Sequence, residues 1–236
     1  MHQRKYGLLI LLFLLILGWR GAAVLAQNPH AQLPDDPAIC SACHQPDTLG
    51  YHWLGSAHEQ AEVPCTACHT DLADPEPDQR RTEQTTVCLD CHTRVRADIQ
   101  RPFGHSVRDG QMQCTDCHSP HGGPGPAELS HSTVNDQCQQ CHAETRGPFL
   151  WEHAPVTEDC GHCHQPHGSN HKSLLQARTP WLCQQCHIAP FHPSNAESGL
   201  GVPPEGASSN MLGQDCSNCH IQIHGSNHPS GSGLTR

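Results

Sequence analysis

Sixteen cysteines fall into eight C-x-x-C pairs along the chain, and a histidine directly follows every pair. Cysteines three apart lie on one face of a helical turn, with the next residue close to that face. Two thiols so placed can form thioethers with one edge of a porphyrin, while the histidine coordinates the iron. C-x-x-C-H is the attachment signature of haem c. The sequence therefore predicts eight haems c, with thioethers from Cys40, Cys43, Cys65, Cys68, Cys88, Cys91, Cys114, Cys117, Cys138, Cys141, Cys160, Cys163, Cys183, Cys186, Cys216 and Cys219, and proximal ligands His44, His69, His92, His118, His142, His164, His187 and His220.

Two other uses of paired cysteines explain less of the pattern. An even number of cysteines suits a disulfide framework in an exported protein, and paired C-x-x-C sites suit zinc ribbons. Neither requires a histidine after each pair. The 236 residues include 22 histidines, so eight chance matches have a probability on the order of one in 10⁸, whereas haem attachment explains them all.

Residues 1–26 have the layout of an export signal. Arg4 and Lys5 form a basic start, Leu8 to Leu17 is an unbroken apolar run, and a small-residue segment ends at Ala26. We expect cleavage after Ala26, which leaves an octahaem cytochrome domain at residues 27–236. A membrane anchor is the alternative, but the apolar run is too short to span a bilayer comfortably. Export also agrees with the motifs, because bacteria attach haem c outside the cytoplasm.

The charge of the exported part bears on its partners. Removal of residues 1–26 takes away Arg4, Lys5 and Arg20 and no acidic residue, so the formal net charge changes from −10 to −13. Haem propionates would make it more negative. We therefore expect no nucleic acid and no anionic lipid surface as a partner. The acidic surface either matches a basic patch on a redox partner or only keeps a haem-rich surface soluble, and the sequence leaves both readings open.

The composition gives the polypeptide little to fold around on its own. Aromatic residues make up 4% of the chain, which also contains 20 prolines and 20 glycines. A chain of this length normally buries a large aliphatic core, and we expect the haems to take that place. The predicted fold is a multihaem c-type cytochrome of mostly short helices and irregular loops wrapped around an extended row of haems, with little or no β-sheet. Without haem the chain should be largely unfolded.

The motifs form a repeat of about one haem per unit. The first cysteines of successive motifs are separated by 25, 23, 26, 24, 22, 23 and 33 residues. The longest step contains residues 193–213, rich in Pro, Gly, Ser and Asn, which we interpret as a loop inserted before the last haem. Units of such an array contact their neighbours, so consecutive haems should form a row.

Each iron needs a sixth ligand, and histidine is the residue available for it. After residue 26 the methionines are Met112 and Met211, so bis-histidine ligation is expected. His2, His30 and His162 lie in the signal, in the N-terminal tail and inside a C-x-x-C pair, and we do not expect them to bind iron. Other histidines recur upstream of every second motif, or just after such a motif with a glycine behind them. The predicted distal ligands are His58, His105, His121, His153, His167, His192 and His224.

A resemblance to a known family rests on three segments: TVNDQCQQCHAETRGPFLWEHAPVTEDCGHCHQPHGSNH from Thr133 to His171, CQQCH at Cys183, and CSNCHIQIHGSNHPSG near the C-terminus. The chain resembles the periplasmic decahaem c-type cytochromes of outer-membrane porin–cytochrome conduits (Mtr/Pio/Dms type), here with eight motifs. The resemblance implies that the cytochrome inserts into an outer-membrane β-barrel porin. It would pass electrons between periplasmic or inner-membrane carriers and an extracellular multihaem cytochrome or other redox partner.

The chain departs from this family at Leu72. The family has a histidine there, just after an attachment motif, whereas this chain reads CHTDL. One of the eight haems would then lack its expected distal ligand, and His52 and His131 are the best substitutes. Otherwise that iron would be five-coordinate and could bind a small ligand.

Three functions stay open at this point. The first is electron transfer across the outer membrane inside a porin, and the second is a free periplasmic electron shuttle or storage protein. The third is a multihaem reductase, which needs an open coordination site and nearby proton donors. Every motif ends in histidine, and spare histidines are numerous enough to close seven or eight irons. We therefore expect an electron-transfer protein of the periplasm, associated with the outer membrane, and not an enzyme.

Overall fold

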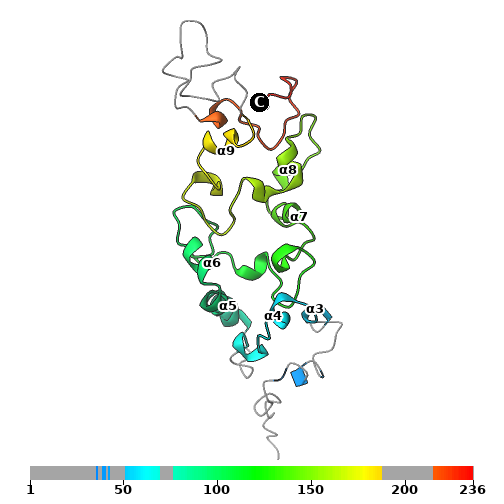
Figure 1. The fold of residues 1–236 in the computed structure, drawn as a ribbon, viewed down its shortest axis with the longest axis vertical. Helices are drawn as coiled ribbons and strands as arrows, with labels where there is room; N and C mark the ends of the chain where they lie inside the picture. The colour runs from blue at the N-terminus through cyan, green and yellow to red at the C-terminus, as the bar shows by residue number, and fades with distance from the viewer. Residues whose placement is uncertain are drawn as a thin grey trace, which may run out of the picture.

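The computed structural model describes residues 36, 39, 40, 42, 51–69, 77–187 and 215–235. These residues form an elongated molecule, in which the chain advances from one end to the other as the sequence proceeds (Figure 1). In the described ranges, regular structure consists of short helices and four isolated β-bridges, with no longer strand. The expectation of short helices, irregular loops and little β-structure is confirmed. The predicted signal, residues 1–26, and the predicted inserted loop, residues 193–213, lie outside the described residues.

The helices are short because most of them are one or two turns around an attachment motif or a loop. The α-helices are α3 (Tyr51–Trp53), α4 (Ala57–Gln60), α5 (Pro77–Cys91), α6 (Thr93–Asp98), α7 (Val134–Cys138), α8 (Ala154–Glu158) and α9 (Trp181–Gln184). The 3-10 helices are η2 (Cys65–Ala67), η3 (Cys114–Asp116), η4 (Pro126–Glu128), η5 (Ala143–Thr145), η6 (Cys160–His162), η7 (Lys172–Leu174) and η8 (Cys216–Asn218).

Attachment motifs alternate between two local structures. The second, fourth, sixth and eighth motifs each open a 3-10 helix that follows an extended residue. The third, fifth and seventh motifs lie at or near the end of an α-helix, namely α5, α7 and α9. With 15 residues, α5 is longer than the short turns predicted at the motifs. The structural repeat is therefore a pair of motifs.

Long-range β-bridges join one repeat to the next. Phe103 pairs with Ser169, and Trp151 pairs with Ser226 in the equivalent place. Both serines are almost fully buried, with 1% and 3% of their surface exposed. A second equivalent set of bridges, His118 with Leu129 and His164 with Leu175, closes the loop after the fourth and sixth motifs. In both long-range bridges, the segment that follows a later motif pairs with the backbone of the preceding repeat.

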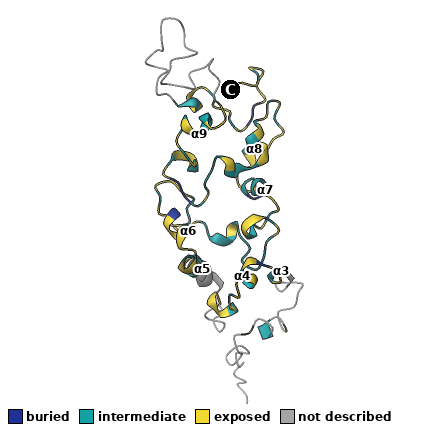
Figure 2. Ribbon diagram, viewed as in Figure 1, coloured by how far each residue is buried: buried dark blue, intermediate teal, exposed yellow. Residues whose placement is uncertain are grey.

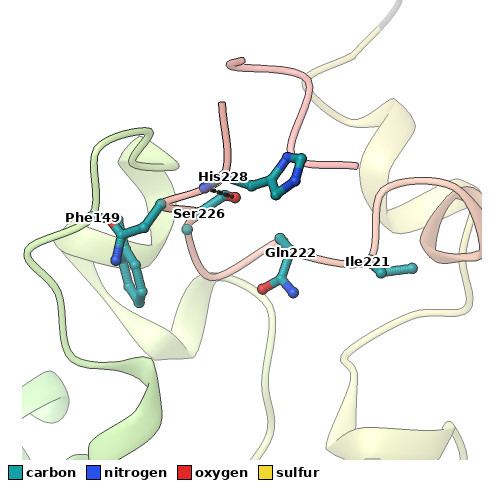
Figure 3. A pocket seen from close by; sticks show the side chains of 7 residues that line it. Phe149, Ile221, Gln222, Ser226 and His228 are labelled. Carbon is teal, nitrogen blue, oxygen red and sulfur yellow. Dashed lines mark hydrogen bonds between the residues drawn. The ribbon is translucent and has the colours of Figure 1, made fainter. Parts of the chain in front are cut away.

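The last of these junctions is seen closely in Figure 3, where Phe149 lies beside the C-terminal segment. A Cβ atom on Gly225 would lie 2.2 Å from Cδ2 of the Phe149 ring, so only glycine fits there. The backbone N–H of His228 donates to Oγ of Ser226 at 3.1 Å and tightens the turn.

The described part of the chain buries almost no apolar side chain. Ile99 and Leu234 are its buried hydrophobic residues, each 7% exposed, and most of the ribbon in Figure 2 is coloured intermediate or exposed. Several large apolar side chains are exposed over 60–72% of their surface: Leu54, Leu150, Trp181 and Ile221. Protein side chains alone therefore form no apolar core here, as expected if a cofactor supplies it. No helix in the described ranges is long and apolar enough to cross a membrane.

Candidate haem-binding centres

All seven fully described attachment motifs close one helical turn in the same way. The backbone N–H of the motif histidine donates to the carbonyl of the first cysteine at 2.9 or 3.0 Å. This i, i+4 bond places both thiols and the imidazole on one side of the turn. The seven motifs begin at Cys65, Cys88, Cys114, Cys138, Cys160, Cys183 and Cys216. In the first motif Cys40 is described, whereas Cys43 and His44 lie outside the described residues.

Six motif histidines face a second imidazole across a gap of nearly constant width. The ring centroids are between 5.8 and 6.3 Å apart. Two metal–nitrogen bonds of about 2 Å, plus the depth of each ring, add up to a separation of about 6 Å. In each pair the second ring is one of the predicted distal ligands. The pairs are His69–His121, His92–His58, His118–His167, His142–His105, His164–His224 and His187–His153.

The pairs follow a fixed register along the sequence. A histidine just after a motif faces the imidazole two motifs earlier, as His121 after the fourth motif faces His69 of the second. A histidine upstream of a motif passes over it and faces the next one, as His58 before the second motif faces His92 of the third. Every facing pair therefore links two histidines from different parts of the array: either two different repeats, or the two motif regions of one repeat.

The upstream histidines are oriented by a carbonyl from a later repeat. Nδ1 of His58 donates to the carbonyl of Pro120, and Nδ1 of His105 to that of Pro166, both at 2.9 Å. A carbonyl only accepts, so the proton is on Nδ1 and Nε2 keeps its lone pair for a metal. For His153 the equivalent backbone belongs to Ile223, but the buried Nδ1 makes no hydrogen bond of normal geometry.

Three motif histidines of the 3-10 class are oriented from behind by their own loop. Nδ1 of His118 donates to the carbonyl of Ala127, and Nδ1 of His164 to that of Ser173, both at 2.8 Å. Ala127 and Ser173 have left-handed backbones, with φ of 54° and 59°, which turn these carbonyls toward the rings. His220 donates in the same way to Gly233. Such a second contact fixes a ligating imidazole and raises its basicity.

Lowered pKa values favour the neutral form of four predicted distal imidazoles. Burial lowers the pKa of His121, His153, His167 and His224, and the imidazole facing each of them lowers it further. A neutral imidazole has a lone pair to offer a metal, whereas a protonated one has none. The direction of these shifts therefore favours iron binding at neutral pH.

Thiols of consecutive motifs approach each other at alternating positions. First cysteines are hydrogen-bonded across motifs in the pairs Cys88–Cys114, Cys138–Cys160 and Cys183–Cys216. Second cysteines interact across motifs in the pairs Cys68–Cys91, Cys117–Cys141 and Cys163–Cys186. Burial and the neighbouring cysteine raise the pKa of Cys138 to about 12 and that of Cys183 to about 11. From the second motif to the eighth, each attachment point thus adjoins the next.

The remaining sequence-predicted residues have mixed outcomes. His52, in α3, is exposed, and His131 is half-buried. No ring of another residue in the described ranges contacts that of His131. His192 and Leu72 lie outside the described residues. His162 is half-exposed beside Glu158.

Sequence reasoning missed the carbonyls that orient the imidazoles. A weak signal existed, because proline precedes the distal histidine in both CHSPHG and CHQPHG. The glycines after the distal histidines predict tight turns. Gly122, Gly168 and Gly225 have φ of 114°, 151° and 134°, so the left-handed turn is present in all three.

The donor set fits haem c. Each described motif presents two thiols and an imidazole on one side of a turn, and six motifs have a second imidazole at the spacing that one iron requires. A profile described as a doubled CXXCH motif matches residues 58–97, 105–147 and 153–190. The chain belongs to this family of multihaem c-type cytochromes. The three matched blocks start at the upstream histidines His58, His105 and His153. Each block ends just after the motif whose histidine faces that upstream histidine.

The names of two relatives of this cytochrome indicate the same kind of cofactor. It is 45% identical over 202 residues to the multiheme cytochrome MtrA of Shewanella baltica, a match covering 84% of this chain and 60% of that protein. It is also 31% identical over 71 residues to the cytochrome c-type protein NrfB of Haemophilus influenzae, covering 28% of this chain and 30% of that protein. These matches place the chain with the Mtr-type multihaem cytochromes. The cytochrome spans less than two thirds of the length of MtrA.

Proposed function

We propose that this cytochrome binds eight haems c, one at each motif, and conducts electrons along them. The facing imidazoles would be the axial ligands of six irons. The proximal ligands of these six are His69, His92, His118, His142, His164 and His187, with distal ligands His121, His58, His167, His105, His224 and His153. The cysteines of every motif would form the thioethers.

The two end motifs need ligands from outside the register. In this register a histidine just after a motif faces the imidazole two motifs earlier. A histidine at position 72, just after the second motif, would therefore face a motif that lies before the first of the eight. The leucine at this position thus leaves none of the eight haems without its distal ligand. The register described above assigns no predicted distal histidine to the first motif, with His44, or to the last, with His220. We propose His192 for the last haem, because it is the predicted distal ligand that precedes this motif. His52 and His131 remain the candidates for the first haem.

The observation that carries electron transfer is that thiols of consecutive motifs lie near enough to interact. Haem c supplies the one-electron iron couple. The chain contributes two imidazoles per iron, so a change of oxidation state needs no exchange of ligand. It also holds each attachment point against the next, at first cysteines and second cysteines in turn. Imidazoles on both sides would close six irons to substrates, and an electron could then pass between neighbouring haems along the described row.

The place of this electron transfer follows from the family resemblance. We propose that the row lies inside an outer-membrane β-barrel porin and connects periplasmic or inner-membrane carriers with an extracellular multihaem cytochrome or other redox partner. The elongated shape in Figure 1 suits a narrow enclosure. The alternative is a free periplasmic shuttle or storage cytochrome.

Fractionation of native membranes separates these two locations. Haem staining should follow the outer-membrane fraction, and affinity purification of the tagged holoprotein in mild detergent should yield a β-barrel protein in equal amount. Haem staining confined to the soluble periplasmic fraction, with no barrel recovered, would make the shuttle the correct function.

A further inference from the structure

In most facing imidazoles with a hydrogen bond at Nδ1, the acceptor is a neutral backbone carbonyl. In His142 the acceptor is a carboxylate. Nδ1 of His142 donates to Oε1 of Glu144 at 3.3 Å. The other ring of this pair, His105, is already oriented by the carbonyl of Pro166. The pair therefore has a hydrogen-bond acceptor behind both of its imidazoles, and one acceptor carries a full negative charge.

The local backbone holds Glu144 beside the ring. The 3-10 helix η5 starts directly after His142, and the N–H and the hydroxyl of Thr145 both donate to the carbonyl of His142, at 3.1 and 2.8 Å. An exposed glutamate is ionised at neutral pH, so the group that accepts the hydrogen bond from Nδ1 of His142 is a carboxylate. The carboxylate is thus a fixed anion at the back of an iron ligand.

A carboxylate behind a ligating imidazole does more than fix its tautomer. By drawing the Nδ1 proton it makes the ring a stronger donor, and a stronger donor favours ferric over ferrous iron. A neutral carbonyl has a smaller effect, since hydrogen bonds to ionised groups are roughly twice as strong. The charge itself adds to the effect, although exposure of 71% of the Glu144 side chain lets solvent screen it.

We propose that Glu144 is a positioning residue that lowers the reduction potential of the haem held by His142 and His105, relative to the haems whose imidazoles meet carbonyls. The inference rests on the proposed ligand pairs. His142 belongs to the fifth of eight motifs, so an electron that travels the whole row must cross this haem. Glu144 would then set a low-potential step in the interior of the row.

The test is a potentiometric titration of the purified holoprotein, followed in the visible haem bands, for the wild type and Glu144→Gln. Glutamine keeps the size and an acceptor oxygen but removes the charge. We expect about one haem's share of the absorbance change to move from the low-potential end of the curve to higher potential. Since Glu144 also interacts with His224, a smaller shift of the neighbouring haem is expected too.

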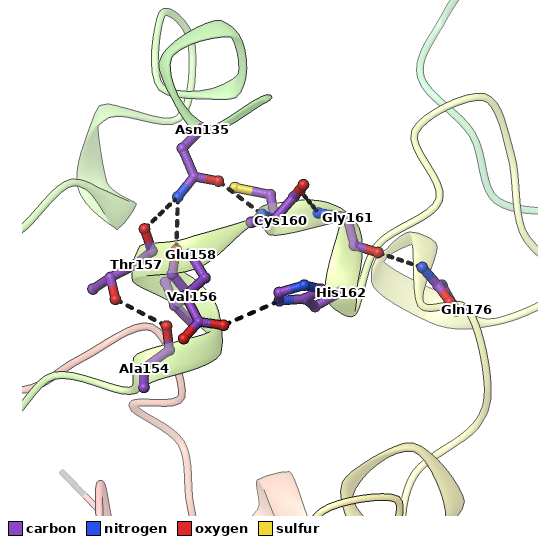
Figure 4. A network of polar contacts seen from close by, with 10 residues as sticks. Asn135, Ala154, Val156, Thr157, Glu158, Cys160, Gly161, His162 and Gln176 are labelled. Carbon is purple, nitrogen blue, oxygen red and sulfur yellow. Dashed lines mark hydrogen bonds and ion pairs between the residues drawn. The ribbon is translucent and has the colours of Figure 1, made fainter. Parts of the chain in front are cut away.

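Glu158→Gln is the matched control. Glu158 lies 3.9 Å from Nδ1 of His162, a histidine outside the facing pairs, and its side chain is 66% exposed (Figure 4). This variant removes the same charge at a similar exposure and should titrate like the wild type. A Glu144→Gln curve that superimposes on the wild-type curve, or an equal shift in Glu158→Gln, would overturn the proposal.

Failure of the ligand assignment is visible separately. His105→Ala should convert one haem from low-spin to high-spin. If it does and Glu144→Gln leaves the titration unchanged, the role of Glu144 alone is wrong. If His105→Ala stays fully low-spin, the underlying ligand pair is wrong, and with it the reason for the role of Glu144.

Discussion

At the residue scale, a histidine becomes an iron ligand when its neighbours settle its tautomer and aim its Nε2. The carbonyls of Pro120 and Pro166 do this for His58 and His105. The sequence could predict the six histidines that face a motif imidazole, because methionine is scarce and the spare histidines recur at fixed places. It contained only a weak signal for the carbonyls behind them, the prolines at 120 and 166, because any residue can supply a backbone acceptor. It could not predict which ring each histidine faces.

Replacement of His153 by alanine tests one pair directly. His153 faces His187 with the rings 6.0 Å apart, so the variant should lose one haem's share of low-spin absorbance and gain the same share of high-spin absorbance. Electron transfer along the row should slow. Visible spectroscopy of the oxidised holoprotein measures the change.

His171→Ala is the control for this variant. His171 uses its backbone N–H to bind Ser169, and it is not one of the rings in the six facing pairs. Its replacement should leave the spectrum low-spin. A low-spin spectrum in His153→Ala as well would remove His153 from the ligands.

At the element scale, the turns after the fourth, sixth and eighth motifs pack on an earlier repeat, and each brings a distal histidine with it. The glycine behind that histidine makes the close approach possible. A Cβ on Gly168 would lie 2.0 Å from the carbonyl oxygen of Asp98, the last residue of α6. The glycines were predictable from the sequence, but the repeat that each turn contacts was not. That contact joins Phe103 to Ser169, and no local pattern encodes a pairing over such a separation.

Gly168→Ala should destabilise the holoprotein by about 1–3 kcal/mol, the usual scale for a side chain forced into a strained backbone region. The displaced turn should also move His167 away from the facing ring of His118 and weaken its proposed bond to iron. Guanidinium unfolding followed by the low-spin bands measures both effects.

Gly104→Ala is the matched control on the facing segment. A Cβ there would lie 3.8 Å from the carbonyl of His167, which is an ordinary contact. This variant should unfold like the wild type. Equal stability of the two variants would show that the turn at Gly168 is not held against α6 as described.

At the scale of the whole molecule, the array is a cofactor-centred repeat. With Ile99 and Leu234 as the buried apolar residues of the described ranges, the chain has too little apolar burial to offset the entropy of ordering its backbone. Composition was sufficient to predict this. The two-motif period was harder to foresee, because the spacings of successive motifs are nearly equal while their local structures alternate between 3-10 and α-helix.

Protein produced without haem attachment should therefore be unfolded. Under reducing conditions we expect far-ultraviolet circular dichroism typical of a disordered chain and no cooperative thermal transition, whereas the holoprotein should show helical signal and a transition. A cooperative transition in the haem-free chain would contradict a core made of haem.

The account as a whole depends on irons closed by two histidines each, and low-temperature EPR of the fully oxidised holoprotein, quantified against its haem content, measures this most directly. We predict low-spin ferric signals that account for all the haem. The signal of largest g should come from His92 and His58, whose ring planes are 85° apart, because perpendicular imidazoles leave two iron orbitals nearly equal in energy. A high-spin signal amounting to one haem or more would contradict a fully closed row and would favour a ligand-binding haem.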